Sequence, residues 1–272
     1  MGRKKKVIVE EAPINNEEPK NRIIMGVDIS TNCIGVTLLL DDGSEYGQLI
    51  EVTHIRPKIP TKIKGTEALV KKKVIFDEFI KQYTKYKIDE IIIEEPLMGS
   101  SKGIIPVVVL LKFNGMLTSS LYETFGIVPK YISSYDARKY AYPSLLAVRK
   151  RNKDGSEYPY NKILNDVKKG HLVLFGSMAW DVDKKVVLQQ MVDDTYPDIP
   201  WVYDKKGELA IENYDASDSM IAALGWMHLD HNGPLDQNTF KVTNVVEGDG
   251  RIDYDVSYWG KTEHRVIFSE KK

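Results

Sequence analysis

The sequence predicts an α/β fold in which helices flank one mixed, five-stranded sheet, and three observations lead to this prediction. Three apolar stretches joined by short connections occupy residues 22–54. Helix-like and strand-like segments then alternate through residues 66–140, and two further helical patterns follow. The length of 272 residues suits one large domain with appendages, and a composition of 42% hydrophobic and 28% charged residues is ordinary for a globular protein.

The N-terminal part of the predicted sheet consists of three strands, Ile23–Ser30, Cys33–Leu40 and Tyr46–His54. The sequence Asp41-Asp42-Gly43 supplies a turn between the second strand and the third. Because the connections are short, we expect an antiparallel meander. Residues 1–21, which precede it, are polar and rich in Glu and Lys, and we expect them to form a disordered tail.

The next predicted elements alternate between helix and strand. Apolar residues recur with a helical period through residues 66–86 and again through 105–125, where Gly126 marks the end. The segment Ile88–Glu94 between them is strongly apolar, as expected of a strand at a sheet centre, where it would lie beside the first strand. A fifth strand and a short helix complete the pattern at Ile127–Ile132 and Ser133–Tyr140, with Ser134 as the expected N-cap.

The C-terminal half adds three kinds of segment to the predicted domain, which spans residues 22–231. Residues 143–175 contain many Lys and irregular sequence, which indicates a basic insertion. Helical patterns return at residues 182–196 and 215–231, joined by an acidic connector. Residues 232–272 are expected to form a C-terminal β extension, with residues 239–269 alternating like a β-hairpin around Gly248-Asp249-Gly250.

Charge is balanced over the whole chain, at a formal net charge of -1, but not along it. Residues 139–170 hold eight Lys/Arg and three Asp/Glu, a local +5, whereas residues 193–218 hold two Lys and eight Asp/Glu, a local -6. These segments fit a phosphate-binding surface beside a metal site, or equally well two solvated loops. The single cysteine fits a reducing, cytoplasmic location, and no apolar run approaches the ~18 residues needed to span a membrane.

Four carboxylates stand at positions that predict a metal site. Asp28 and Glu94 each end an apolar strand, and Asp215 and Asp218 lie three residues apart at the start of the 215–231 helix. Converging carboxylates repel one another unless a hard cation such as Mg²⁺ binds between them, and two such ions commonly serve phosphodiester hydrolysis. Alternatives remain open: Asp28 as a turn residue, Asp215 as a helix cap, Asp218 as a partner of the helix dipole, and Glu95 in place of Glu94.

These residues give the chain a resemblance to the RuvC family of Holliday-junction resolvases, within the RNase H-like superfamily. Ile24-Met25-Gly26-Val27-Asp28-Ile29-Ser30 resembles the family's first strand, Ile92-Ile93-Glu94-Glu95-Pro96 its Glu-bearing strand end, and Asp215-Ala216-Ser217-Asp218 its final acidic pair. The resemblance extends over residues 22–142 and 176–231. The longer 143–175 segment and the extra tail look like those of phage or viral members.

The resemblance implies a metal-dependent endonuclease that resolves four-way or other branched DNA by paired nicks. It implies two Mg²⁺ per site, with Mn²⁺ expected to substitute, and it names Asp28, Glu94, Asp215 and Asp218 as their ligands. It also implies a homodimer, with the 105–125 helix as the candidate interface. Its location would be the cytoplasm, together with DNA, or the host cytoplasm for a phage protein.

Several cations are candidates for DNA contacts in such an enzyme. Lys185, beside Lys184, lies on a helix that resembles a lysine-bearing helix of the family, and it could hold the scissile phosphate. The other candidates are Arg138, Lys139, Arg149, Lys150 and Arg151. For the last three, a solvated loop tip is the simpler alternative. A solvated helix end is the simpler interpretation of the pair His228 and His231.

Three other functions fit parts of the same pattern. An RNase H-like nuclease acting on flaps or RNA–DNA hybrids would need the same carboxylates. A non-catalytic junction-binding protein would not need four of them. An actin-like sugar or acetate kinase would explain Asp28-Ile29-Ser30-Thr31, but it requires a second similar half and glycine-rich adenosine loops that the sequence lacks.

Overall fold

The computed structural model describes residues 21–96, 104–143, 184–235, 239–248 and 251–268. Its centre is a mixed five-stranded sheet in the order β3-β2-β1-β4-β5, in which β1, β2 and β3 are antiparallel and β4 and β5 run parallel to β1. The predicted meander and the central β1–β4 pair are therefore present. The strands are β1 Arg22–Ile29, β2 Ile34–Asp41, β3 Gln48–Ile55, β4 Ile88–Glu94 and β5 Lys130–Ile132.

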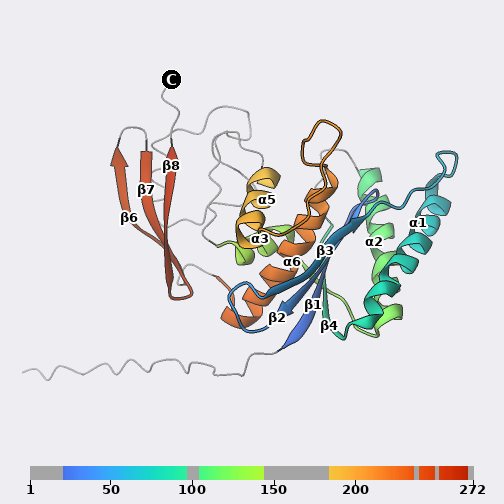
Figure 1. The fold of residues 1–272 in the computed structure, drawn as a ribbon, viewed down its shortest axis with the longest axis horizontal. Coiled ribbons are helices and arrows are strands. Elements are labelled where there is room, and N and C mark those ends of the chain that lie inside the picture. Colours follow the sequence, from blue (N-terminus) through green and yellow to red (C-terminus); the bar gives the residue numbers. More distant parts are fainter. Residues whose placement is uncertain (1–20, 97–103, 144–183, 236–238, 249–250, 269–272) are drawn as a thin grey trace, which may run out of the picture.

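Helices cover both faces of this sheet (Figure 1), which confirms the predicted layered α/β architecture. Helices α3, α5 and α6 lie on one face and α1 and α2 on the other. Each face buries its own apolar cluster, and alternate residues of β1 belong to different clusters, Ile24 to the first and Met25 to the second. The helices are α1 Gly65–Ile80, followed by the 3-10 helix η1 Lys81–Lys85, α2 Ile104–Phe125, α3 Ser134–Ala141, α5 Lys184–Thr195 and α6 Glu212–Asn232.

Helix α6 packs against the sheet with backbone close to backbone. A Cβ atom built on Gly26 would lie 2.1 Å from the carbonyl oxygen of Ser219, and one built on Gly35 would lie 1.9 Å from that of Asp215. The side-chain hydroxyls of Thr37 and Ser219 meet at 2.8 Å between these points. Only glycine permits such an approach, so Gly26 and Gly35 fix the height and register of α6 over β1 and β2.

Helix α2 is the most apolar helix of the described chain and is only partly covered. By length and composition it could cross a membrane, with a mean hydropathy of 1.7, but the core helix of a soluble protein passes the same test. Its inner face buries Phe113, Leu117 and Leu121 against the sheet. Its outer face leaves Ile104 and Ile105 77% and 74% exposed.

Ion pairs around the largely buried Arg22 close the end of the sheet where β1 begins. The guanidinium of Arg22 donates to the carboxylates of Asp41 at 2.9 Å, of Glu90 and of Asp230. The Asp41 side chain is fully buried and also contacts the imidazole of His231 at 2.9 Å. This network joins β1, β2, β4 and the last turns of α6.

The C-terminal residues form a separate three-stranded antiparallel sheet beyond α3 and α6 (Figure 1), with β6 Phe240–Gly248, β7 Arg251–Tyr258 and β8 Lys261–Phe268. The prediction of a single hairpin was wrong, because a second tight turn at Trp259 and Gly260 adds a third strand. Both turn residues have positive φ, 46° and 76°, as a type I′ turn requires. The Trp259 ring stacks on Tyr140 with a centroid distance of 6.4 Å, which joins this sheet to α3.

Three boundaries also differ from the sequence prediction. The N-cap of α3 is Ser133, whose Oγ accepts from the Asp136 N–H at 3.0 Å, so the assignment of Ser134 was wrong. Strand β5 is shorter than predicted. Helix α6 begins at Glu212, which places Asp215 in the first turn of the helix instead of at its cap.

Candidate functional site

Two strand-end carboxylates lie side by side at the centre of the sheet. Asp28 and Glu94 follow directly after Val27 and Ile93, which are paired on the parallel strands β1 and β4. Side chains alternate along a strand, so Glu94 shares the face of Ile92, which packs in the same apolar cluster as α6. Glu95 lies beyond the end of β4 and is exposed. Asp28 and Glu94 therefore occupy the α6 face at one end of the sheet.

The first turn of α6 reaches the same end. Gly35 is the β2 partner of Asp28 in the sheet register, and the backbone of Asp215 lies directly on Gly35. The backbone of Ser219, one helical turn later, lies on Gly26, which is two residues before Asp28 on β1. The helix thus runs antiparallel to β1, and its acidic N-terminus meets the strand ends that carry Asp28 and Glu94.

Asp218 turns toward α3, where it meets a buried cation. The Nη2 of Arg138 donates to Asp218 Oδ1 at 3.3 Å, and both residues are 5% exposed. The contact is single and long, and the Nε of Arg138 is buried without a hydrogen-bond partner among the described residues. Arg138, predicted as a DNA-contact candidate, therefore lies in the interior beside Asp218.

Cys33 and His54 also lie at this end, and sequence inspection did not connect them with the site. His54 pairs with Gly35 across β3 and β2, in the same row as Asp28. Burial lowers the pKa of His54, an effect that the charge of Asp215 opposes. Burial, followed by the charge of Asp215 and a thiol hydrogen bond to it, raises the pKa of Cys33. Only the sheet register could have shown that these residues are neighbours.

The carboxylates suit a hard divalent cation by donor type, since oxygen ligands are what Mg²⁺ prefers. In the described part of the chain, however, no three Asp, Glu, His or Cys side chains are placed so as to hold one metal ion. The four carboxylates gather at one end of the sheet without forming a closed shell. The Arg138 contact uses only Oδ1 of Asp218, which leaves its second carboxylate oxygen outside that contact.

The remaining predicted cations are placed as follows. Lys139 donates to the Leu235 carbonyl at 2.6 Å and lies over the Tyr140 ring, so it holds the segment after α6. Lys184 and Lys185 begin α5, but their side chains are outside the described part of the chain. Arg149, Lys150 and Arg151, together with most of the predicted insertion, lie outside the described residues.

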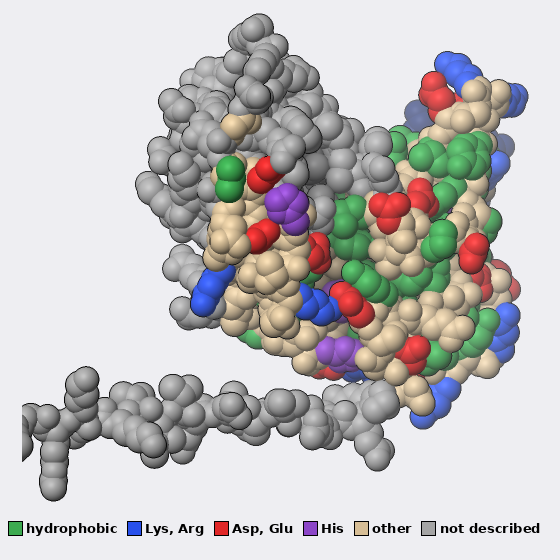
Figure 2. Space-filling view, turned by 60° about the vertical axis from the view of Figure 1, so that its left-hand side comes forward, with side chains coloured by type: hydrophobic (Ala, Val, Ile, Leu, Met, Phe, Trp, Pro, Cys, Tyr) green, Lys and Arg blue, Asp and Glu red, His purple; other side chains and the backbone are tan. Residues whose placement is uncertain are grey.

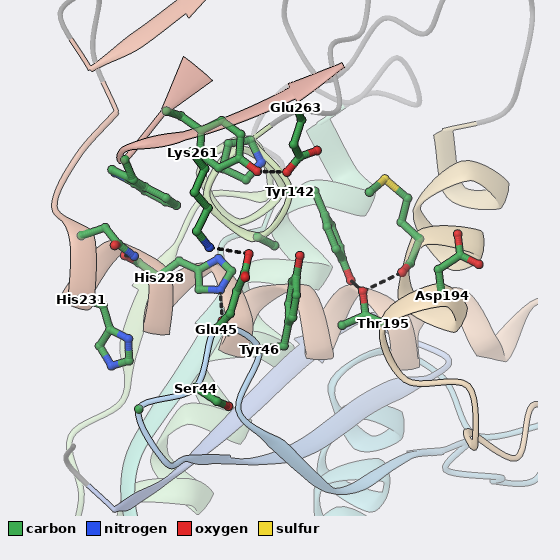
Figure 3. A pocket seen from close by; sticks show the side chains of 17 residues that line it. Ser44, Glu45, Tyr46, Tyr142, Asp194, Thr195, His228, His231, Lys261 and Glu263 are labelled. Atoms are coloured by element: carbon green, nitrogen blue, oxygen red, sulfur yellow. Dashed lines mark hydrogen bonds and ion pairs between the residues drawn. The ribbon is translucent and has the colours of Figure 1, made fainter. Parts of the chain in front are cut away.

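A cavity of about 460 Å³ is lined by His228 and His231 from the last turns of α6 (Figure 3), so it lies at the opposite end of this helix from Asp215 and Asp218. Tyr46, Tyr142, Trp259 and His228 are among the residues that line it. His228 is 6% exposed, so the expectation of a solvated helix end was wrong for this residue, whereas His231 is exposed. Its Nδ1 lies 2.8 Å from the Tyr140 carbonyl, and its Nε2 contacts that of Glu45. Burial lowers the pKa of His228 against the opposing effect of these carbonyls.

The face drawn in Figure 2 carries no patch of a single charge sign in its described part. Figure 2 shows acidic, basic and hydrophobic side chains interspersed over the described part of one face. A function must therefore be argued from the local arrangement at the carboxylate end of the sheet.

No protein-family model matches the sequence, and no curated protein matches it. Solved structures do match. RuvC of Thermus thermophilus in complex with a Holliday junction substrate is 9% identical, with 78% of this chain and 96% of that chain covered and a TM-score of 0.44. The yeast mitochondrial Holliday junction resolvase Ydc2 is 14% identical, with coverage of 81% and 85% and a TM-score of 0.41. The fowlpox virus resolvase with its Holliday junction DNA is 14% identical, with coverage of 75% and 96% and a TM-score of 0.33.

Phosphatases and a sugar kinase are also among the matching structures. At these identities and TM-scores the likeness carries no argument about activity, which must rest on the residues themselves.

Proposed function

We propose that this protein is a metal-dependent endonuclease that cuts four-way or other branched DNA by paired nicks. The observation that supports the proposal most directly is the gathering of Asp28, Glu94 and the first turn of α6 on one face at one end of the central sheet. The expected family motifs come from three separated segments of the sequence, and in the structure those segments meet at this point.

In this proposal the carboxylates of Asp28, Glu94, Asp215 and Asp218 would hold divalent cations. When bound, such cations activate water and neutralise charge at a phosphodiester. Arg138 forms a buried ion pair with Asp218, and a cation beside a carboxylate favours its charged form. Glycines 26 and 35 set the position of the helix that carries Asp215 and Asp218.

The outer face of α2 supports a homodimer in this proposal. Its exposed apolar side chains are Ile104, Ile105, Val108, Val109 and Leu111, and α1 adds the exposed Val70 and Val74. Apolar patches of this kind mark interaction surfaces on globular proteins. A two-fold symmetric dimer would present two equal sites to two opposed strands, as paired nicking requires.

The test is incubation of the purified chain with an end-labelled four-way junction, in Mg²⁺ and in EDTA. A model replication fork, a 5′ flap and an RNA–DNA hybrid of matched length serve as parallel substrates. We expect Mg²⁺-dependent nicks at symmetric positions of the junction. Cutting of the hybrid or the flap alone would favour the alternative nuclease functions, and binding without cutting in Mg²⁺ or Mn²⁺ would favour a non-catalytic junction-binding protein.

A further inference from the structure

The segment from β3 to α1 is basic and lies at the carboxylate end of the sheet. Residues 56–64 contain Arg56, Lys58, Lys62 and Lys64 and no Asp or Glu, although the whole chain is balanced at 38 Lys/Arg to 39 Asp/Glu. We propose that this segment, named here the basic loop, binds the sugar–phosphate backbone of a duplex DNA arm next to the cutting site. This inference rests on the proposed function and adds to it a surface that positions the substrate.

The register of the sheet fixes where the basic loop starts. Ile55, the last residue of β3, pairs with Ile34 of β2, which pairs with Ile29 of β1. Strand β3 therefore ends level with Ile29, the residue after Asp28. Arg56 follows at once. In Figure 1 the loop projects past the sheet at the same end as the connector that leads into α6.

Arg56 ties the loop to the acidic end of α6. Its guanidinium forms an ion pair with Glu212, which lies in the first turn of α6, three residues before Asp215. A second cation supports the same end, because Lys72 of α1 donates to the carbonyl of Thr31 and to the side chain of Asn32 in the β1–β2 turn. The loop is thus connected to the elements that carry Asp28 and Asp215.

The loop is held in one conformation by its apolar residues. Pro57 is buried and Ile59 and Ile63 are partly buried, while the Ile63 N–H donates to the Pro60 carbonyl at 3.0 Å. The two prolines restrict the backbone further. Binding a phosphate backbone would therefore cost less ordering entropy than it would for a flexible tail.

The lysines of this loop point outward without ion-pair partners. Lys58, Lys62 and Lys64 are exposed, and in the described ranges none of them forms a salt bridge. The connector before α6 carries both signs, with Lys205 and Lys206 beside Asp204 and Glu208, so its charges offset one another. A site built from carboxylates repels a phosphodiester, and an uncompensated row of cations at its edge offsets that repulsion.

The experiment compares a triple variant of the basic loop, Lys58→Gln, Lys62→Gln and Lys64→Gln, with a charge-matched control. The control is Lys81→Gln, Lys85→Gln and Lys87→Gln, which removes three exposed lysines just before β4, at the opposite end of the sheet from Glu94. Binding to a four-way junction and to duplex DNA is measured in Ca²⁺ or EDTA over a range of salt. Circular dichroism melts verify that both variants fold.

We expect the loop variant to lose about two to three units of the log–log salt slope, at ~0.9 per phosphate contact, and the control to lose less than about one. The triple Lys→Arg variant at the same positions should keep the parental slope. Equal slopes for the loop variant and the control overturn this inference, even if the parent cuts junctions. If the parent binds DNA with the expected loop dependence but never cuts it, only the proposed endonuclease activity is overturned. If the parent binds neither the junction nor the duplex, both the activity and this inference are overturned.

Discussion

At the scale of single residues, Asp28 has the position on which most of the candidate site depends. It stands between Glu94 on β4 and Gly35 on β2, and Gly35 carries the backbone of Asp215. Its side chain is therefore at the point where three segments of the sequence meet.

Asp28→Asn should reduce junction cutting by ~10²-fold or more, a loss comparable to removal of one group that stabilises charge at the reacting centre. Junction affinity should change little, because phosphate contacts come mostly from Lys and Arg. Single-turnover cutting in Mg²⁺, with binding measured separately, checks both statements. Asp42→Asn, an exposed change at the β2–β3 turn, serves as the control, and a parental rate for Asp28→Asn would contradict the site assignment.

Gly35→Ala tests the close approach of α6. The new Cβ would meet the Asp215 carbonyl oxygen at 1.9 Å, so the helix must shift, at a cost of about 1–3 kcal/mol in the free energy of unfolding. Urea denaturation measures the loss. Gly115→Ala in α2, where nothing lies within 4 Å of the new Cβ, should be neutral or stabilising by up to ~1 kcal/mol. Equal effects of the two changes would mean that the packing of α6 on β2 is looser than described.

At the scale of elements, α2 is an apolar helix that leaves part of its apolar surface exposed. Its N-terminal half is strongly apolar, yet Ile104 and Ile105 are mostly exposed and Val108, Val109 and Leu111 are 36–40% exposed. A helix of this kind is usually covered by another surface.

The double change Ile105→Gln and Val109→Gln, one turn apart on the exposed face of α2, should convert a dimer into a monomer. Light scattering is expected to give twice the 31.0 kDa chain mass for the parent and one chain mass for the variant. Val202→Gln with Val246→Gln, which changes two exposed valines far from α2, should leave the mass at the parental value. A parent that is already monomeric with and without junction would contradict the dimer.

At the scale of the whole molecule, the Arg22 network at the β1 start couples stability to pH. Burial alone would raise the pKa of Asp41, but hydrogen bonds from His231 and Arg22 hold it below the ordinary value. A carboxyl whose pKa is lower in the folded state stabilises the fold above its unfolded pKa, and this contribution is lost as the pH falls through the folded pKa. The corresponding window lies below about pH 4.

Asp41→Asn should therefore destabilise the protein at neutral pH by about 1.5–3 kcal/mol, because Arg22 loses one charged hydrogen-bond partner and keeps Glu90 and Asp230. The difference from the parent should shrink below about pH 4, where Asp41 itself becomes protonated. Urea unfolding at pH 7 and at pH 3 to 4 measures both values. A difference that is constant over this range would mean that the charge of Asp41 does not contribute.

The sequence by itself determined the local elements and their order. Apolar periodicity and turn residues are local properties, so β1, β2, β4, α2 and α6 could be predicted to within a few residues. It also determined that Asp28 and Glu94 end neighbouring parallel strands, because an apolar strand such as Ile88–Glu94 is found at a sheet centre. A second turn at Trp259 was missed because tryptophan seldom occupies a position with positive φ.

Only the tertiary structure decided which side chains meet. Three relations follow from strand register and helix packing. His54 lies in the same sheet row as Asp28, Arg138 contacts Asp218 in the interior, and the basic loop starts beside the carboxylates. These relations join residues at least 26 positions apart in the sequence, and no local pattern records them. The physical reason is that register is fixed by the burial of one whole face and by close contacts such as Gly35 on Asp215, which exist only once the layers have packed.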